Sequence, residues 1–236
     1  MKKADKKQEI DEAIPLVLTT VSGQPVGSFP GNVIESLRGL VTRIEKKGSF
    51  PERLSLVAAR RGEGVTYTTQ ALAAMLANDL SAKVCIVDLN WWWPYASALV
   101  TADNLGLAAV LNGEAVLDDV IIPTGWPNLA FVPAGKLAKQ DRPVLSRSQA
   151  LKRLIEELGK RFDHLILDIP AVLTTNDAVP LAALGSACCL VVRQGVTEIN
   201  DIQQALDEID HLTILGVILN RVQYVSPARL TKLVSQ

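Results

Sequence analysis

The sequence has few of the residues that would form a metal centre or a disulfide framework. It contains three cysteines and two histidines in 236 residues, with neither a Cys-x-x-Cys pair nor a Cys/His cluster. Cys85, Cys188 and Cys189 all lie in apolar runs, which favours buried, reduced thiols over a metal site or a disulfide. Reduced thiols are typical of a reducing compartment, so we expect a cytoplasmic protein.

Long apolar runs and an excess of charge are also absent. No apolar run approaches the roughly 18 residues of a transmembrane helix. The first lysines are followed by acidic residues rather than by the apolar core of a signal peptide. A net charge of −1 gives no reason to expect a nucleic-acid binder. Hydrophobic residues make up 48% of the chain and charged residues 21%, which suits one globular domain with a full core.

Apolar runs alternate with helical patterns along the chain. Strand-like runs occupy residues 54–59, 83–88, 128–133, 164–168, 187–193 and 214–219. Helical patterns occupy residues 67–80, 105–118, 147–161, 177–184 and 198–210. Continuous apolar strands are typical of parallel strands covered on both faces. The alternation therefore predicts an α/β fold, a doubly wound and mostly parallel sheet flanked by helices.

The two ends of the chain differ in composition from the middle. Residues 1–31 are charged at first and then rich in proline and glycine, and they are predicted to form a flexible, irregular arm. A single domain is expected over residues 32–222, followed by a short tail over residues 223–236. The domain begins with a helix, where Asn32 and Glu35 have the spacing of a capping box.

One stretch, LSLVAARRGEGVTYTTQALA, has the layout of a phosphate-binding loop. An apolar run leads into a turn with Gly62 and Gly64 and then into a helical segment. Backbone N–H groups and a helix N-terminus would therefore face an anion. Against the pattern G-x-x-x-x-G-K-S/T, Gly64 and Thr66 match, while Ala59 replaces the first glycine and Val65 replaces the lysine. On these residues alone, an ordinary strand–helix turn remains the alternative.

Two further apolar runs end in an aspartate. Asp88 ends KVCIVD and Asp168 ends HLILD, and the carboxyl ends of parallel strands meet at one edge of a sheet. Carboxylates in this place hold magnesium and its water ligands in nucleotide hydrolases. If magnesium binds, we expect both aspartates, with Thr66, to hold it beside the loop. Helix capping is the alternative role for each aspartate.

From Glu35 to Val222 the chain resembles the bacterial tyrosine kinases of capsule and exopolysaccharide systems, within the MinD/ParA-like group of P-loop ATPases. The resemblance rests on the loop, the two aspartates and the segments GLAAVLNGEAVLDDVI, NLAFVPAG, RFDHLILDIPAV, NDAVPLA and LGVILNRV. It implies a P-loop NTPase-like domain that binds ATP or ADP with magnesium. The positions implied for nucleotide contact are Arg60, Arg61, Gly62, Gly64, Thr66, Asn220 and Arg221.

The chain departs from this family at residues that carry the chemistry. The family's loop resembles P-G-E-G-K-S-T, so Val65 stands in place of its lysine, and Asn90 stands in place of a second aspartate after Asp88. The family ends in a tyrosine cluster, whereas only Tyr224 lies near the end here. Losing one preorganised donor costs about 100- to 1000-fold in rate. Little or no phosphoryl transfer is expected, which leaves Asp88 and Asp168 as remnants of a catalytic site.

The resemblance and its gaps together predict a pseudokinase or pseudo-ATPase. Such a protein would require no cofactor and would act as a cytoplasmic regulatory or scaffolding component of capsular or exopolysaccharide biosynthesis and export. The alternative is a weak ATP-binding tyrosine kinase or ATPase in which Arg60 or Arg61 holds phosphate in place of the lysine. A ParA-like positioning factor is a third interpretation, which the mid-chain matches disfavour.

A run of three tryptophans gives the first candidate for a partner surface. Trp91, Trp92 and Trp93 follow the second strand end, and exposed aromatic residues near a cleft often mark a contact surface. The expected partner is a membrane polysaccharide co-polymerase or a related export protein. Packing of the rings on the adjacent helices and in the nucleotide cleft is the alternative.

The helix at the start of the domain gives the second candidate. The family carries an E-x-x-R-x-x-R helix that pairs subunits; Glu35 and Arg38 fit it, and Val41 replaces the second arginine. We expect a monomer or a small oligomer rather than a ring, either a homo-oligomer or a hetero-oligomer with an active paralogue. The protein would be cytoplasmic, or peripheral at the inner face of the membrane through its partner.

Overall fold

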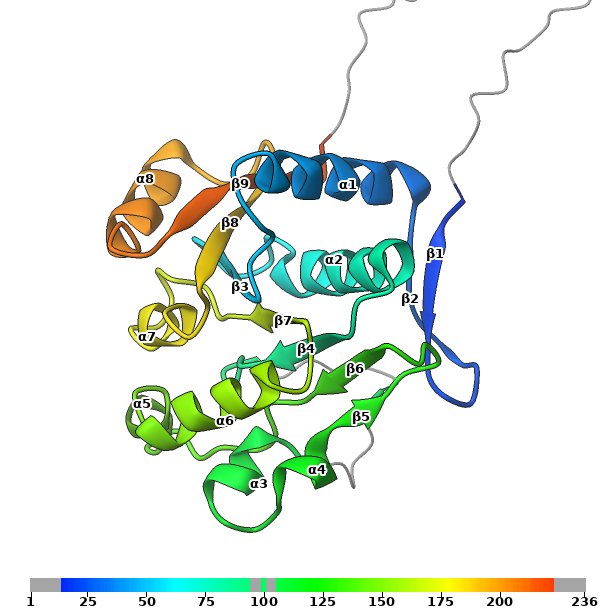
Figure 1. Ribbon diagram of the computed structural model, residues 1–236. Coiled ribbons are helices and arrows are strands. Elements are labelled where there is room, and N and C mark those ends of the chain that lie inside the picture. Colours follow the sequence, from blue (N-terminus) through cyan, green and yellow to red (C-terminus); the bar gives the residue numbers. More distant parts are fainter. Residues whose placement is uncertain (1–13, 94–98, 101–104, 223–236) are drawn as a thin grey trace, which may run out of the picture.

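A seven-stranded sheet forms the centre of the protein, shown by a computed structural model that describes residues 14–93, 99–100 and 105–222 (Figure 1). The strand order is β5-β6-β4-β7-β3-β8-β9, and every neighbouring pair is parallel except β5 and β6. The strands are β3 (Arg53–Ala58), β4 (Val84–Asp88), β5 (Ile122–Pro123), β6 (Leu129–Val132), β7 (His164–Asp168), β8 (Ala187–Arg193) and β9 (Ile214–Asn220). The predicted parallel strands are confirmed to within one or two residues.

Helices cover both faces of the sheet. On one face lie α1 (Gly31–Glu45) and α2 (Val65–Leu80). The other face carries α3 (Leu107–Leu111), α4 (Leu117–Val120), α6 (Gln149–Gly159), α7 (Ala178–Ala182) and α8 (Ile199–Glu208), with α5 (Arg142–Leu145) beside α6 (Figure 1). The predicted doubly wound α/β fold is confirmed. None of the helices in the described ranges is both long enough and apolar enough to cross a membrane.

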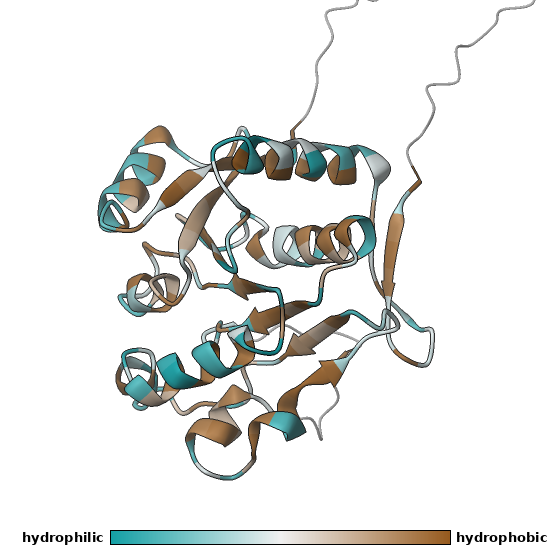
Figure 2. Ribbon diagram, in the orientation of Figure 1, coloured by the Kyte–Doolittle hydropathy of each residue, from teal (hydrophilic) through white to brown (hydrophobic). Residues whose placement is uncertain are grey.

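The strands are apolar on both sides because helices pack on both sides. Leu54 and Leu56 of β3 belong to the core under α1 and α2, whereas Val57 belongs to the core on the opposite face. Figure 2 shows this as brown strands between helices that are brown on one side and teal on the other. Continuous apolar sequence, rather than strict alternation, is the expected result of such double burial.

Two expectations about helices need correction. The predicted helix over 105–118 is two short helices, because Gly113 adopts a φ of +77° that ends the first of them. The predicted capping box is wrong, since α1 begins after Pro30 with no side-chain cap, and Glu35 pairs with Arg38 instead. The apolar face of α1 is buried as its spacing indicates.

The expectation of an irregular arm is wrong for the part of it that the structure describes. Strands β1 (Leu16–Thr19) and β2 (Pro25–Phe29) form an antiparallel hairpin. Leu18 and Phe29 are fully buried in the core beside α2, so burial of these two side chains stabilises the pairing despite the prolines. Residues 1–13 and the predicted tail at 223–236, with Tyr224, lie outside the described residues.

Candidate functional site

The glycine-bearing loop follows β3, an inner strand of the sheet that lies between β7 and β8. Gly62 and Gly64 have φ values of +87° and +97°, a conformation that favours glycine because it has no Cβ. Gly64 is the residue before α2, so the free N–H groups of the first helical turn face the loop. A cavity of about 270 Å³ lies here, and its walls include Arg61, Gly62, Val65, Asn90, Trp93 and Asp168.

The buried side chain of Glu63 forms hydrogen bonds within the loop and to the segment before α8. Its carboxylate accepts a hydrogen bond from the Ala59 N–H at 3.0 Å and another from the Thr197 hydroxyl at 2.6 Å. The side chain is buried at 4% exposure. One backbone donor of the loop is therefore committed to a carboxylate of the same loop. The sequence reasoning missed this role, although the spacing of four residues between Ala59 and Glu63 within one turn could have indicated it.

Asn220 packs directly on the loop, as its predicted place at the site requires. Its amide donates to the Glu63 carbonyl at 2.8 Å. A Cβ on Gly64 would lie 2.0 Å from that amide nitrogen, so this contact also requires glycine. Arg221 is exposed, and it lines a second cavity of about 400 Å³ between α1, α2 and β9. The two cavities share Gly64.

The two arginines proposed as substitutes for the lysine are both engaged elsewhere. Arg60 forms a two-pronged ion pair with Asp201 of α8, at 2.9 and 2.8 Å, and this carboxylate raises the pKa of the guanidinium. Arg61 lies over the ring of Trp93, 5.0 Å from its centroid. Neither Asp201 nor this stacking was foreseen, because both partners are distant from the arginines in sequence.

The three predicted magnesium ligands come together. Asp88 and Asp168 are directly opposite in the register of β4 and β7, and each is 3% exposed. The Thr66 hydroxyl hydrogen-bonds to Asp168, but within the described residues the Oδ1 atom of Asp168 has no hydrogen-bond partner. Burial, and then the Asp88 charge, raise the pKa of Asp168 above its ordinary value. Magnesium binding itself stays a prediction.

Asn90 and Val65 occupy the positions where the family's chemistry is missing. Asn90 shapes the turn after β4: its N–H donates to Asp88 at 2.8 Å, and its side-chain oxygen accepts from the Trp93 N–H at 3.1 Å. Val65 is the first residue of α2 and lines the cavity. An isopropyl side chain gives this position neither charge nor a hydrogen-bond donor.

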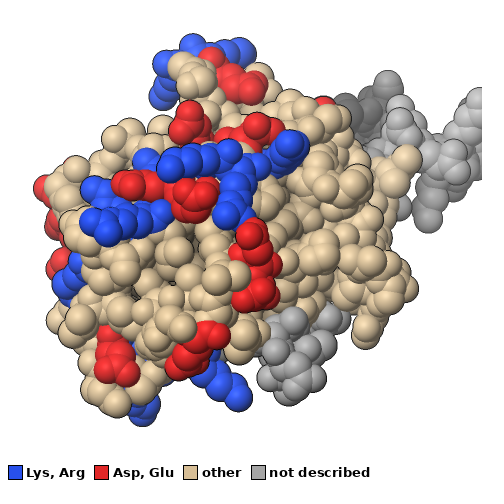
Figure 3. All heavy atoms as spheres, turned by 60° about the horizontal axis from the view of Figure 1, so that its bottom comes forward, with Lys and Arg blue, Asp and Glu red and all other residues tan. Residues whose placement is uncertain are grey.

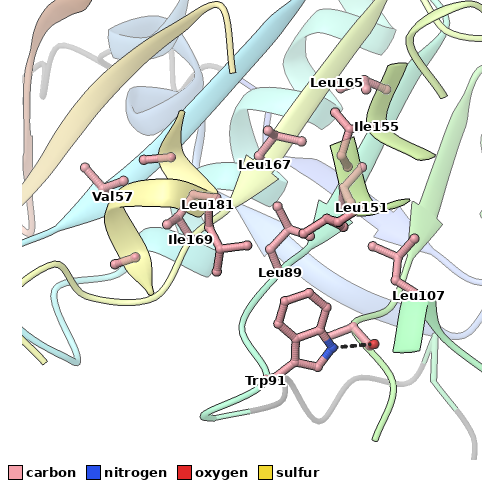
Figure 4. Packing of buried hydrophobic residues seen from close by; sticks show 14 of the residues in the cluster. Val57, Leu89, Trp91, Leu107, Leu151, Ile155, Leu165, Leu167, Ile169 and Leu181 are labelled. Atoms are coloured by element: carbon pink, nitrogen blue, oxygen red, sulfur yellow. Dashed lines mark hydrogen bonds between the residues drawn. The ribbon is translucent and has the colours of Figure 1, made fainter. Parts of the chain in front are cut away.

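The three tryptophans divide between the core and the cavity. Trp91 is 1% exposed, and its indole N–H donates to the Ala134 carbonyl at 2.8 Å (Figure 4). It therefore offers no contact surface, which corrects the prediction for this ring. Trp92 and Trp93 are half-buried, and Arg142 lies 5.5 Å from the Trp92 ring centroid. Neighbouring side chains of an irregular loop diverge, which is why the three rings separate.

The predicted subunit-pairing residues are joined within the chain. Arg38 binds Asp79 of α2 through two hydrogen bonds, at 2.6 and 3.0 Å, and also pairs with Glu35. Asp79 holds the guanidinium and raises its pKa further, with Glu35 adding to the effect. Val41 lies on the buried face of α1 and is not exposed. The charges of this helix are thus balanced without a second subunit.

The residues at the loop do not suit a magnesium–triphosphate complex. The backbone has the shape of an anion cradle, and Thr66, Asp88 and Asp168 supply oxygen atoms for a metal. A triphosphate also needs positive charge near its outer phosphates, and the cavity wall has Val65 in place of the family's lysine, Arg60 paired with Asp201, and Arg61 stacked on Trp93. The Oδ1 atom of Asp168 adds an unpaired acceptor there.

The fold and the loop together define a P-loop NTPase-like α/β protein. No model of a known protein family matches the chain. Tyrosine-protein kinase CpsD of Streptococcus agalactiae is 29% identical over 192 residues, which cover 80% of this chain and 83% of that protein. Tyrosine-protein kinase etk of Escherichia coli is 26% identical over 196 residues, covering 81% of this chain but 27% of that protein.

Solved structures agree with these relatives. The BceF tyrosine kinase domain matches with a TM-score of 0.67 and 25% identity, over 79% of this chain and 76% of that one. The septum site-determining protein MinD of Pyrococcus horikoshii, complexed with Mg-ADP, matches with a TM-score of 0.60 and 26% identity. The match covers 78% of this chain and 77% of that one. The homologues of this chain are bacterial tyrosine kinases, and its structural neighbours are their kinase domains and MinD ATPases.

Proposed function

We propose that this protein is a pseudokinase or pseudo-ATPase, a cytoplasmic regulatory or scaffolding component of capsular or exopolysaccharide biosynthesis and export. One observation carries the proposal: the position of the phosphate-binding lysine is Val65, and both arginines of the loop contact other groups. Arg60 is held by Asp201, and Arg61 is stacked on Trp93. The polysaccharide context rests on the kinship with the tyrosine kinases.

The purified protein is expected to show no magnesium-dependent ATP turnover above background and no phosphotyrosine. The reason is the missing charge at Val65 together with Asn90 in place of a carboxylate, since each such loss costs about 100- to 1000-fold in rate. Phosphate release and anti-phosphotyrosine blotting measure these activities. Val65→Lys alone should not restore full activity, because Asn90 remains.

A weak enzyme is the second candidate, and the retained trio of Thr66, Asp88 and Asp168 favours it. Arg60 or Arg61 would have to leave its present partner and reach the phosphates. Hydrolysis that disappears in Asp168→Ala would establish this enzyme and refute the pseudoenzyme. Hydrolysis that also falls in Arg61→Gln would identify the arginine that substitutes for the lysine.

The protein is expected to be a monomer or a small oligomer. Arg38 is satisfied by Asp79 and Glu35 of its own chain, and Val41 offers no charge to a neighbour. A ring that relied on this helix would have to break the Arg38–Asp79 pair and leave a partner's acidic group without a cation. Multi-angle light scattering without nucleotide measures the mass. A stable particle of about eight subunits would contradict the expectation.

For the partner surface we propose Trp92 and Trp93. The two rings are half-buried, Trp93 in the wall of the cavity and Trp92 against the core. Such rings supply a large apolar contact area, about 150–250 Å² for each ring that becomes buried. Arg61 contacts the Trp93 ring at the cavity, and Arg142 contacts the Trp92 ring. Figure 3 shows one face of the molecule, on which charged side chains gather in a band in the upper part, with smaller charged groups below it. A membrane-associated polysaccharide co-polymerase or related export protein is the proposed partner.

A further inference from the structure

The cavity at the glycine-bearing loop is surrounded by more negative than positive groups. The charged side chains in its wall or next to it are Arg60, Arg61, Glu63, Asp88, Asp168 and Asp201. Two arginines thus stand against four carboxylates. Arg60 is paired with Asp201, and Arg61 shares the surroundings of the cavity with the buried carboxyl groups of Glu63, Asp88 and Asp168. A nucleotide would bring several further negative charges into this surrounding.

Asp168 supplies an unused acceptor in that wall. The residue is 3% exposed, lines the cavity, and has one carboxylate oxygen without a hydrogen-bond partner among the described residues. A buried carboxylate oxygen that accepts no hydrogen bond destabilises the folded protein. A positively charged donor forms the strongest hydrogen bond to such an oxygen. The torsion that exchanges the two oxygens of an aspartate is soft, so a ligand in the cavity can be met by either oxygen.

The wall of the same cavity already holds a guanidinium. Arg61 lies 5.0 Å from the ring centroid of Trp93, and an indole face is the strongest aromatic partner of a cation. Ala58, Val65 and Ile169 add apolar surface to the cavity, which suits the methylene stem of a long basic side chain. At about 270 Å³, the cavity is slightly smaller than the sites of drug-sized ligands.

We propose that this cavity binds an alkylguanidinium group, which enters between Trp93 and Asp168, in place of a nucleotide. Magnesium is a poorer occupant, because it usually relies on substrate phosphates for part of its oxygen shell. The guanidinium could come from a free small molecule or from an arginine side chain of a partner protein. The proposal deepens the proposed function, on which it rests only through the missing lysine at Val65.

Agmatine, which is a free alkylguanidinium without a carboxylate, is the first probe. Isothermal titration calorimetry at about 0.15 M salt, with EDTA present to remove metals, should show saturable binding at one site. Asp168→Asn should weaken this binding by at least about tenfold, while Asp207→Asn, an exposed aspartate of α8, should leave it unchanged. Arg61→Gln should strengthen it severalfold, because the Trp93 face becomes free.

The pattern across the variants decides the proposal. If Asp168→Asn and Asp207→Asn bind agmatine equally well, the binding is non-specific surface association and the proposal is overturned. The proposal is also overturned if neither the unmodified protein nor Arg61→Gln binds agmatine. Trp93→Leu gives a second variant that should also weaken agmatine binding, should Asp168→Asn prove misfolded by circular dichroism. Binding of N-acetyl-arginine-N-methylamide as tight as agmatine would point to a partner's arginine, and weaker binding to a free small molecule.

The two proposals fail in different ways. ATP turnover that depends on magnesium would refute the pseudoenzyme, whatever the result with agmatine. An inactive protein that binds no guanidinium would leave the pseudoenzyme standing and refute the cation site. Mg-ATP that binds the unmodified protein more tightly than agmatine does, and competes with it, would also overturn the cation site.

Discussion

Trp91→Ala should lower the free energy of unfolding by about 3–5 kcal/mol. The ring is one of the largest fully buried side chains and lies in the core cluster with Leu89 and Leu107 (Figure 4). Its removal leaves a cavity, and the Ala134 carbonyl loses one of its two hydrogen-bond donors and keeps the Ala108 N–H. For a chain of this size the melting temperature should fall by roughly 10 °C. Thermal unfolding followed by circular dichroism measures the shift.

The neighbouring Trp93 provides the matched control. It is half-buried, and its recorded ring contact is with Arg61, so Trp93→Ala should cost about 1 kcal/mol. Equal losses for the two variants would show that the core placement of Trp91 is wrong. The double variant of Trp92 and Trp93 should keep most of its stability but bind its partner at least about tenfold more weakly, or 1.4 kcal/mol. A large drop in stability with unchanged partner binding would refute the docking surface.

Asp168→Asn should raise the free energy of unfolding by about 1–3 kcal/mol, measured by urea titration with EDTA present. The variant removes a buried charge that faces Asp88 and has an unpaired oxygen. A destabilising buried carboxyl such as that of Asp168 is typical of a functional site, where function and not stability requires the group. Asp207→Asn, on the surface, is the control and should change stability little.

The difference in the free energy of unfolding between Asp168→Asn and the unmodified protein should depend on pH. The pKa of Asp168 is raised in the folded protein, so folding favours the protonated carboxyl. Below the ordinary value of 3.8 the carboxyl is neutral in both states, and the two proteins should then be most alike. As the pH rises above that value, the unmodified protein loses stability relative to Asp168→Asn. A gap that stayed constant with pH would show that the carboxylate charge is not the cause.

The fold could be predicted because its information is local. Each parallel strand is a short apolar run, each main helix repeats its apolar residues at a helical period, and chirality leaves few ways to connect them. The ends of the strands then fix where Asp88 and Asp168 lie. The hairpin was missed because its prolines and glycines indicate an irregular segment, while its pairing depends on burying Leu18 and Phe29 against distant residues.

The sequence by itself determined the parallel strands of the sheet, the glycine-bearing loop, the two strand-end aspartates and the lack of a lysine at Val65, but not the antiparallel edge strand β5. Only the tertiary structure decided what the remaining charges do. Arg60 meets Asp201 across 141 positions of sequence, Glu63 meets Thr197 across 134, and no local pattern specifies either pair. The structure also divided three identical neighbours into one core ring and two at the surface. Side-chain partners depend on which elements pack together, and the period of a segment does not contain that information.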